Sequence, residues 1–504
     1  MAHRALPSTT SNDAGPRAPL PDSRRWIALA AVAVAQLMIG LDQTIMTIAL
    51  PSVQGSLHFG DADRQWVITA FAVTYGSLLL TGGRLGDRFG RQRALLAGVT
   101  GFALASALGG AAPTSGVLFA ARAAQGAFGA LMTPAVLAVI VHAFTDLRER
   151  GRAFAIYGTV MGSSSGIGVL LGGVLTQYLD WRWCMLVNLP IAAAAALGIS
   201  YGVRAAPGDR SQRLDLAGAL LVTLALAGIA LGFAQADSDG WGAVSTLAPL
   251  AAGAVLLVAF VARQATAKPP LLPLRIVLNR RRAASYLAVA GLAVGWFGSL
   301  FFLTFYLQSA RDFSAIKAGL AFLPLTAGLM IGVRLVARVL HRHATAGLLL
   351  PAGLLVIAAG LALLTALHTS SNYWALVMPV FALVGLGSGW VLITANSIAT
   401  HDAGADTSVA GAMVVTSQQA GAALGTALLN TIAASAAAHY ARTHHVSAIE
   451  LTVHGLNTAA LVAAVAVAVV AVAAFTMLGR PGSRPTGQEP ANSDTGIAPG
   501  ASSQ

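Results

Sequence analysis

Fourteen long runs of apolar residues, separated by short polar segments, account for most of the chain. Each run holds about 20 residues, the length that an α-helix needs to cross the hydrocarbon core of a bilayer. We place the runs at 26–50, 65–83, 94–112, 116–141, 153–175, 184–203, 214–235, 245–263, 284–308, 316–338, 345–366, 374–397, 408–434 and 456–478. The first run is too long for a signal peptide and contains Asp42. The pattern predicts an all-α membrane protein with fourteen transmembrane helices.

The positive charges gather in alternate polar segments. With the N-terminus placed in the cytoplasm, 25 of the 31 Lys and Arg residues fall in cytoplasmic segments and five fall outside. Arg122 alone lies deep within a span, away from the polar segments. An excess of Lys and Arg in cytoplasmic loops is typical of membrane proteins. The distribution therefore supports the span count and predicts a multi-pass protein of the cell membrane with both termini in the cytoplasm.

A basic segment rich in proline, from Arg263 to Arg282, indicates the start of a second half. We expect two six-helix bundles, at 26–203 and 284–478, with two additional helices and a basic linker at 204–283. The tails, 1–25 and 479–504, are rich in Pro, Ser, Gly and Thr. Such composition cannot form a packed core, so we expect both tails to be disordered in the cytoplasm.

Composition excludes several classes of protein. Hydrophobic residues make up 56% of the chain and charged residues 10%, against about 25% charged residues in a typical soluble domain. So few charges exclude a cytosolic enzyme, and the single cysteine, Cys184, excludes an internal disulfide. The net charge of +12 is spread over loops, not gathered on one face, so we expect no nucleic-acid partner. The excess of arginine over lysine, with the abundant alanine, indicates a GC-rich bacterial genome.

Two ionisable residues besides histidine lie deep inside spans: Asp42 in the first and Arg122 in the fourth. A charge at the bilayer centre costs at least about 2.5 kcal/mol, so each needs a partner or a function. At about 1.5 Å per residue, Asp42 lies about 12 Å and Arg122 about 9 Å from the outer surface. One interpretation is a structural ion pair, or an arginine that reaches the surface. The other is a titratable acid that faces a central cavity, with Arg122 controlling its charge.

Other polar and small residues recur on the predicted helices. We interpret five amides as candidates for lining a substrate cavity: Gln36, Gln43, Gln125, Asn396 and Gln418. Small residues at helical spacing let membrane helices approach closely or rock against each other. The span 153–175 has such a face, made by Gly158, Gly162, Gly166, Gly168, Gly172 and Gly173.

Four histidines lie in the predicted outer loop before the last span: His439, His444, His445 and His454. Histidines can bind a metal, but no cysteine supports them, and we interpret the segment as a solvated loop. The sequence contains no phosphate-binding loop. We therefore expect no metal, no cofactor and no use of ATP.

The segment that follows the second span reads Gly83-Arg-Leu-Gly-Asp87-Arg88-Phe-Gly90-Arg91. It resembles the G-x-L-x-D-R-x-G-R signature of the major facilitator superfamily. The two outer glycines permit a tight turn and close helix approach. Asp87 can accept hydrogen bonds from the arginines or cap a helix N-terminus. The resemblance implies a gate on the cytoplasmic side.

Further motifs resemble the fourteen-helix drug:proton antiporters within that superfamily. They are Leu41–Pro51 in the first span, Arg122–Gly126 in the fourth, and the segments 181–183 and 188–190 before and within the sixth. The resemblance implies the major facilitator fold, proton coupling through Asp42 and Arg122, and a monomer that exports small molecules. Two positions depart from the antiporter pattern in the fifth span, where Ser164 replaces a glycine and Val169 replaces a proline.

Two other functions stay open at this stage. An importer or uniporter on the same fold would also fit, and the valine in the fifth span favours it. A membrane-embedded enzyme would need paired acids or a nucleophile with its base inside the spans. Asp42 is the one deep acid, so we expect no enzyme. The leading prediction is a secondary transporter that exports hydrophobic or amphipathic molecules in exchange for protons, by rocking of two halves about the membrane midplane.

Overall fold

The computed structural model describes residues 22–60, 63–144, 146–205, 208–209, 215–268, 270–340, 345–401 and 407–478. Within these ranges the chain is helical and forms no strand. Among the described residues, fourteen helical spans are long and apolar enough to cross a membrane, which confirms the predicted fold class and span count. The predicted tails lie outside the described residues, except that residues 22–25 already belong to the first helix.

The first six spans form one group of helices. They are α1 (Asp22–Leu57), α2 (Trp66–Phe89), α3 (Arg91–Gly110), α4 (Ser115–Ala143), α5 (Leu147–Tyr178), and a sixth span divided into α6 (Trp183–Leu186) and α7 (Asn188–Gly202). Within the group, α4 packs on α2 and α3, while α1 packs on α5 and α7. Apolar residues at helical spacing, such as Val32, Ala35 and Ile39 of α1, fill these contacts.

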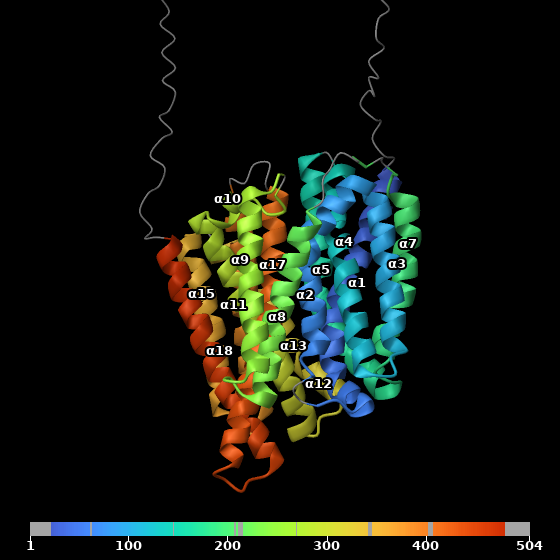
Figure 1. The fold of residues 1–504 in the computed structure, drawn as a ribbon. Helices are drawn as coiled ribbons and strands as arrows, with labels where there is room; N and C mark the ends of the chain where they lie inside the picture. The colour runs from blue at the N-terminus through green and yellow to red at the C-terminus, as the bar shows by residue number, and fades with distance from the viewer. Residues whose placement is uncertain are drawn as a thin grey trace, which may run out of the picture.

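The last six spans form a second group, on the left in Figure 1. Its first span is α11 (Arg280–Phe305), extended by the π-helical turn η1 (Tyr306–Ala310). The next three are α12 (Ala315–Ala321) with α13 (Leu323–Leu335) and η2 (Val336–Leu340), α15 (Ala346–Leu363) with η3 (Leu364–Ala366), and η4 (Tyr373–Val377) with α16 (Met378–Thr400). The group ends with α17 (Thr407–Ala441) and α18 (Ala448–Leu478).

The two remaining spans, α8 (Leu216–Asp239) and α9 (Val244–Thr266), pack on each other. The short α10 (Leu274–Val277) follows them in the linker. Helix α8 also contacts α2 of the first group and α17 of the second, and it lies between them in Figure 1. The Thr223 hydroxyl donates to Ser77 Oγ (2.8 Å), and the Thr431 hydroxyl donates to the Phe233 carbonyl (2.6 Å). Helix α8 therefore covers the seam between the two groups.

Some helices are longer than the apolar runs that predicted them. Helix α1 continues through Pro51 to Leu57, and α17 and α18 together project beyond their neighbours at one end of the molecule (Figure 1). The physical reason is that hydropathy detects only the part of a helix inside lipid, while the backbone hydrogen bonds continue into water. The predicted histidine loop is one result, since His439 lies in α17 and His454 in α18.

The start of α1 and the end of α18 lie at the same edge of the bundle, which we call the terminal edge (Figure 1). Hydrogen bonds between the two groups are found from the middle of the helices to the opposite, distal edge. There, Gln308 Nε2 donates to the Ile48 carbonyl (3.0 Å), and the Thr416 hydroxyl donates to the Gly76 carbonyl (3.1 Å). Nearer the terminal edge, a Cβ added at Gly158 or Gly411 would meet no atom within 4 Å. The two groups are thus closed against each other on the distal side.

The division into two bundles and an inserted pair stays a prediction as a statement about domains. One apolar core runs without interruption from Ile45 and Val67 in the first group to Phe301 and Ala459 in the second. A continuous core does not by itself define a boundary between independently folding units.

Candidate functional site

A buried ion pair joins α1 to α4 in the middle of the first group. Arg122 Nη1 donates to Asp42 Oδ2, and the two side chains are 1% and 0% exposed. Ion pairs this deeply buried persist only when further hydrogen bonds satisfy the remaining polar atoms. The structure therefore brings together the two charges that the sequence placed at similar depth.

Neutral side chains complete the environment of the carboxylate. Asp42 Oδ1 accepts from Gln125 Nε2 (2.9 Å) and from Asn188 Nδ2 (2.8 Å). Gln125 Nε2 also donates to the Ser106 hydroxyl (2.8 Å), which lies 3.3 Å from Asn188 Nδ2. Helices α1, α3, α4 and α7 thus each contribute one or more groups to a closed polar network around Asp42.

Arg122 makes contacts beyond the ion pair. Its Nε donates to the Val67 carbonyl (2.8 Å), and Nη1 donates to Gln125 Oε1 (2.8 Å). Its guanidinium lies over the Phe71 ring, 4.8 Å from the centroid, where a cation gains a further attraction. Val67 and Phe71 belong to α2, so one side chain links three helices. A change in the charge of Asp42 would act on all of them.

One of the two interpretations of the sequence has Asp42 facing a central cavity, and the structure differs on this point. Asp42 is enclosed within the first group, because donors from two other helices, α4 and α7, surround its two oxygens. Two of the amides proposed for the cavity are enclosed as well. Gln125 belongs to the network of Asp42, and Gln36 accepts from the Thr133 hydroxyl (3.1 Å), which contacts Tyr75 Oη (2.8 Å).

The other amides have different positions. Gln43 of α1 lies where the two groups meet, and its Oε1 is 3.5 Å from Gln419 Nε2 of α17. Gln418 is half-buried. Asn396 is exposed and donates to the Leu392 carbonyl of its own helix (2.8 Å). The sequence interpretation thus chose Gln418, whereas its neighbour Gln419 makes the contact across the two groups.

Helix α5 uses its glycines on two faces. A Cβ at Gly168 would collide with the hydroxyl of Thr44, and one at Gly172 would lie 3.0 Å from the Ile45 carbonyl, so these two pack on α1. The face that includes Gly162, Gly166 and Gly173 instead approaches the second group, at Met330, Thr326 and Ala315 respectively. The predicted face of small residues therefore has two parts. One part packs on α1 inside the first group, and the other contacts the second group.

The valine at the position of the antiporter proline lies on the second of these faces. Val169 is buried, and its carbonyl would lie 2.8 Å from a Cβ at Gly319 of α12. The contact needs a glycine partner because the two backbones approach so closely. It shows that close approach at this point does not require the proline.

The predicted gate motif forms the end of α2 and the turn into α3. Gly90 has φ of 93°, a left-handed conformation that favours glycine, and it joins the two helices directly. Asp87, Arg88 and Arg91 lie at the terminal edge, and the Asp87 side chain is exposed. Its backbone carbonyl accepts from the amide of Asp209 (2.9 Å). Gly83 lies inside the helix near Pro134, and Gly82 makes the closer approach to α4.

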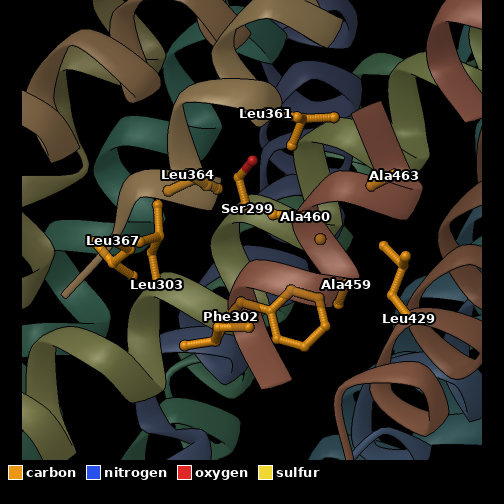
Figure 2. Close-up of a pocket in the computed structure, with 12 residues that line it drawn as sticks. Ser299, Phe302, Leu303, Leu361, Leu364, Leu367, Leu429, Ala459, Ala460 and Ala463 are labelled. Carbon is orange, nitrogen blue, oxygen red and sulfur yellow. The ribbon is translucent and has the colours of Figure 1, made fainter. Parts of the chain in front are cut away.

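An apolar pocket lies elsewhere, inside the second group. Figure 2 shows its lining side chains, which come from α11, α15, α17, α18 and the turn after α15 and include Phe302, Leu361, Leu429 and Ala460. Ser299 is the one polar side chain among the lining residues, and its hydroxyl already donates to the Gly295 carbonyl (2.6 Å). The pocket offers no free hydrogen-bonding group and no charge, so we do not connect it with Asp42.

The histidines near the distal end of α17 and α18 are arranged around an aromatic ring. His444 and His454 stack on Tyr440, each with its ring centroid 4.0 Å from the tyrosine centroid. His439 Nδ1 lies 3.1 Å from Arg442 Nη2. The stacking helps to explain why these helices continue so far beyond the predicted spans.

Comparison with known proteins gives consistent results. The chain is 46% identical over 427 residues to the puromycin resistance protein pur8 of Streptomyces alboniger, covering 83% of this chain and 84% of that protein. It is 33% identical over 414 residues to the tetracenomycin C resistance and export protein of Streptomyces glaucescens (82% and 76%). It is 36% identical over 418 residues to the cephamycin export protein CmcT of Amycolatopsis lactamdurans (81% and 85%).

Solved structures share the fold. A bacterial homologue of the human lysosomal transporter Spinster, in an inward-facing and unoccupied conformation, superposes with a TM-score of 0.63 at 17% identity, covering 91% of this chain and 98% of that one. The sequence profile of the Major Facilitator Superfamily matches residues 32–426. The chain therefore belongs to the Major Facilitator Superfamily and is a multi-pass membrane transporter.

Proposed function

We propose that this protein exports hydrophobic or amphipathic small molecules, of the kind represented by puromycin and tetracenomycin C, in exchange for protons. The names of its relatives support export of antibiotics. The observation that carries the proton-coupling proposal is the fully enclosed Asp42–Arg122 pair, since a bare carboxylate in a membrane interior is retained only at a cost.

In this mechanism Asp42 is the group that carries the proton. When Asp42 is ionised, it holds Arg122 and, through Arg122, the start of α2. Protonation removes the negative charge, so the attraction to the guanidinium falls and α2 and α4 are free to shift relative to α1. Arg122 itself keeps its charge throughout, because a guanidinium does not lose its proton in proteins.

Asn188 can serve both charge states of the acid. In the structure its Nδ2 donates to Asp42, while its Oδ1 is buried and has no hydrogen-bond partner among the described residues. Rotation of the amide by a half turn would present that oxygen to the hydroxyl of a protonated carboxyl. Asn188 therefore positions Asp42 and lowers the cost of its neutral form.

We place the terminal edge in the cytoplasm, following the distribution of positive charge. The structure then represents a state closed toward the outside, in which Asp42 is paired with Arg122. A proton that crosses about 150 mV supplies about 3.5 kcal/mol, enough for a substrate gradient of roughly 300-fold when one charge moves per cycle. We propose that the protein works as a monomer and catalyses no chemical reaction.

The test compares Asp42→Asn with Asp215→Asn in cells that express each variant equally. Asp215 is the matched control, since it is also a buried acid paired with an arginine, Arg263. Resistance to puromycin, tetracenomycin C and cephamycin identifies a compound that the wild type exports. We expect Asp42→Asn to abolish export of that compound driven by a proton gradient and Asp215→Asn to retain it.

Undiminished gradient-driven export by Asp42→Asn would contradict the role of Asp42. The direction of transport is tested in inverted vesicles with an acidic interior. Accumulation of the compound there supports proton exchange. Equilibration without accumulation would support the uniporter, for which Val169 at the proline position is the specific observation.

A further inference from the structure

A cluster of polar and aromatic side chains closes the distal side of the seam between α2 and α17. Arg64, two residues before α2, donates from Nε to Asn430 Oδ1 of α17 (3.0 Å). Its guanidinium also lies over two rings of α11, at 4.4 Å from the Phe305 centroid and 5.2 Å from the Phe301 centroid. We call Arg64, Asn430, Phe301 and Phe305 the distal clamp. One side chain of the first group thus holds two helices of the second.

Below the clamp, the seam contains polar groups that have no hydrogen-bond partner among the described residues. Gln65 is 1% exposed, and within the described part of the chain neither its amide nitrogen nor its amide oxygen makes a hydrogen bond. It precedes α2 without capping it. Thr426 of α17 is also 1% exposed, and its hydroxyl lacks a partner among the same residues.

The register of the two helices places Gln65 and Thr426 in the same layer. Three contacts fix that register: Gly76 with Thr416, Thr69 with the Ala423 carbonyl (3.4 Å), and Arg64 with Asn430. The helices run antiparallel, so Gln65, between Thr69 and Arg64, lies beside the stretch from Ala423 to Asn430 that contains Thr426. Burying unpaired amides and hydroxyls is unfavourable, and water relieves that cost when the seam opens.

We propose that the distal side of this seam is the extracellular gate and that Arg64 holds it closed through contacts that break in each transport cycle. The unpaired side chains of Gln65 and Thr426 bias this gate toward opening. The clamp favours the closed seam through a charge-assisted hydrogen bond and two cation–π contacts. The unpaired polar groups of Gln65 and Thr426 destabilise the closed seam. The free energies of the closed and open states therefore stay similar, and the gate can open in each transport cycle. The proposal rests on the cytoplasmic placement of the terminal edge made above.

The gate also shares an element with the buried ion pair. Arg122 donates to the Val67 carbonyl, three residues after Arg64 in the chain. The first turn of α2 is therefore held by Arg122 on one side and by the distal clamp on the other. Movement of Arg122 away from Asp42 would be transmitted to the gate through this single turn.

The experiment measures access to the seam directly. Thr69→Cys, 1% exposed in the closed seam, serves as the reporter in a Cys184→Ser background, which removes the one native cysteine. A membrane-impermeant maleimide is added to intact cells, and the labelling rate is measured. Loss of one charge-assisted hydrogen bond and two ring contacts predicts that Arg64→Ala raises the rate about tenfold.

Arg182→Ala is the matched control, because Arg182 is also a distal arginine stacked on an aromatic ring, that of Trp181 in its own group. The labelling rate measured with Arg182→Ala should equal that of the Thr69→Cys reporter without a further substitution. Gln65→Leu, added to Arg64→Ala, should lower the rate several-fold, since it removes the unpaired amide. If Arg64→Ala does not accumulate in the membrane, Arg64→Lys provides the test, with a smaller increase expected.

An unchanged labelling rate in the Arg64 variant, or an equal increase in Arg182→Ala, would overturn the proposal that Arg64 holds the gate closed. A higher labelling rate on adding Gln65→Leu to Arg64→Ala would overturn the proposal that the unpaired Gln65 favours opening. Labelling needs neither a substrate nor a proton gradient. A failure of the gate proposal is therefore distinguishable from a failure of proton exchange, which the Asp42 variants test separately.

Discussion

Two carboxylate–guanidinium pairs in this transporter have different surroundings. Asp42 and Arg122 lie inside the membrane and are both almost completely buried. Asp215 is also buried, but it lies at the terminal edge, and the side chain of its partner Arg263 is 43% exposed. The first pair joins α1 to α4 within the first group of helices. The second joins the start of α8 to α9.

The two carboxylates also differ in how their neighbours are fixed. Asp215 accepts from the Gly218 amide (2.9 Å), Gln264 Nε2 (3.0 Å) and Arg263 Nε (2.7 Å), and Gln264 in turn accepts from the Leu272 amide (3.0 Å). One of the donors to Asp215 is therefore a backbone amide, which stays beside the carboxylate as long as α8 is folded. The donors to Asp42 are all side chains from other helices. Asp42 is held only by side chains of other helices, so its surroundings change when those helices move. Asp215 is held in part by the backbone of its own helix, and it fixes the start of α8 to α9.

The largest difference is expected when each arginine is removed. Arg122→Leu leaves a buried carboxylate without its countercharge, which costs about 3–5 kcal/mol, whereas Arg263→Leu affects a partly exposed pair and should cost at most about 1 kcal/mol. Thermal unfolding of the purified variants in detergent measures both. Equal losses of stability would remove the distinction between the two pairs.

The double variant Asp42→Asn with Arg122→Leu sharpens this result. It removes both charges, so most of the stability lost in Arg122→Leu should return, while proton-driven export stays absent. Recovery of export together with stability would show that the pair is only structural.

A smaller effect is expected at Asn188. Asn188→Leu removes one donor from Asp42 and the unpaired oxygen from the buried network, so the fold should lose about 1–3 kcal/mol. The pH at which export is half-maximal should move, because the amide donates to Asp42, the acid that we propose carries the proton. Asn457→Leu is the control, since that side chain donates to the Leu367 carbonyl far from the pair. A pH profile that moves equally in both variants would contradict a specific role for Asn188.

The smallest effect concerns pH and Asp215. Burial tends to raise the pKa of Asp215, but hydrogen bonds from Gly218, Gln264 and Arg263 outweigh it and hold the pKa below its ordinary value. The contacts of ionised Asp215 therefore stabilise the fold above the ordinary carboxyl pKa of about 4. This contribution is lost as the pH falls through the lowered pKa. The wild type should unfold at a higher temperature than Asp215→Asn near pH 7, with the gap narrowing below about pH 4. A constant gap over that range would contradict this account.

The sequence predicted the number of spans and the fold class, because both depend on hydropathy. It offered the pairing of Asp42 with Arg122 as one of two interpretations, from the cost of a charge in lipid. It did not predict Ser106 or Val67 as partners, since these contacts join residues that are distant in the chain and carry no local pattern. Asn188 was visible only as part of a family motif. Gln419 could not be separated from Gln418, because the choice depends on how α17 is rotated against α1.

The distal clamp was missed for a related reason. Arg64 lies in a short loop, where an isolated basic residue is normally solvated, and only the tertiary fold brings Asn430 and the rings of α11 to it. Helix α5 shows the opposite case. Its glycine spacing correctly predicted close packing, while the assignment of each glycine to one of two partners required the structure.

Proton release on substrate binding tests the central claim most directly. Purified protein in weakly buffered detergent solution is mixed with the compound that the wild type exports, and a pH-sensitive dye reports the protons set free. We predict that the wild type and Asp215→Asn release a proton on binding and that Asp42→Asn binds the compound without releasing one. Equal release by Asp42→Asn would show that another group carries the proton and would contradict the account.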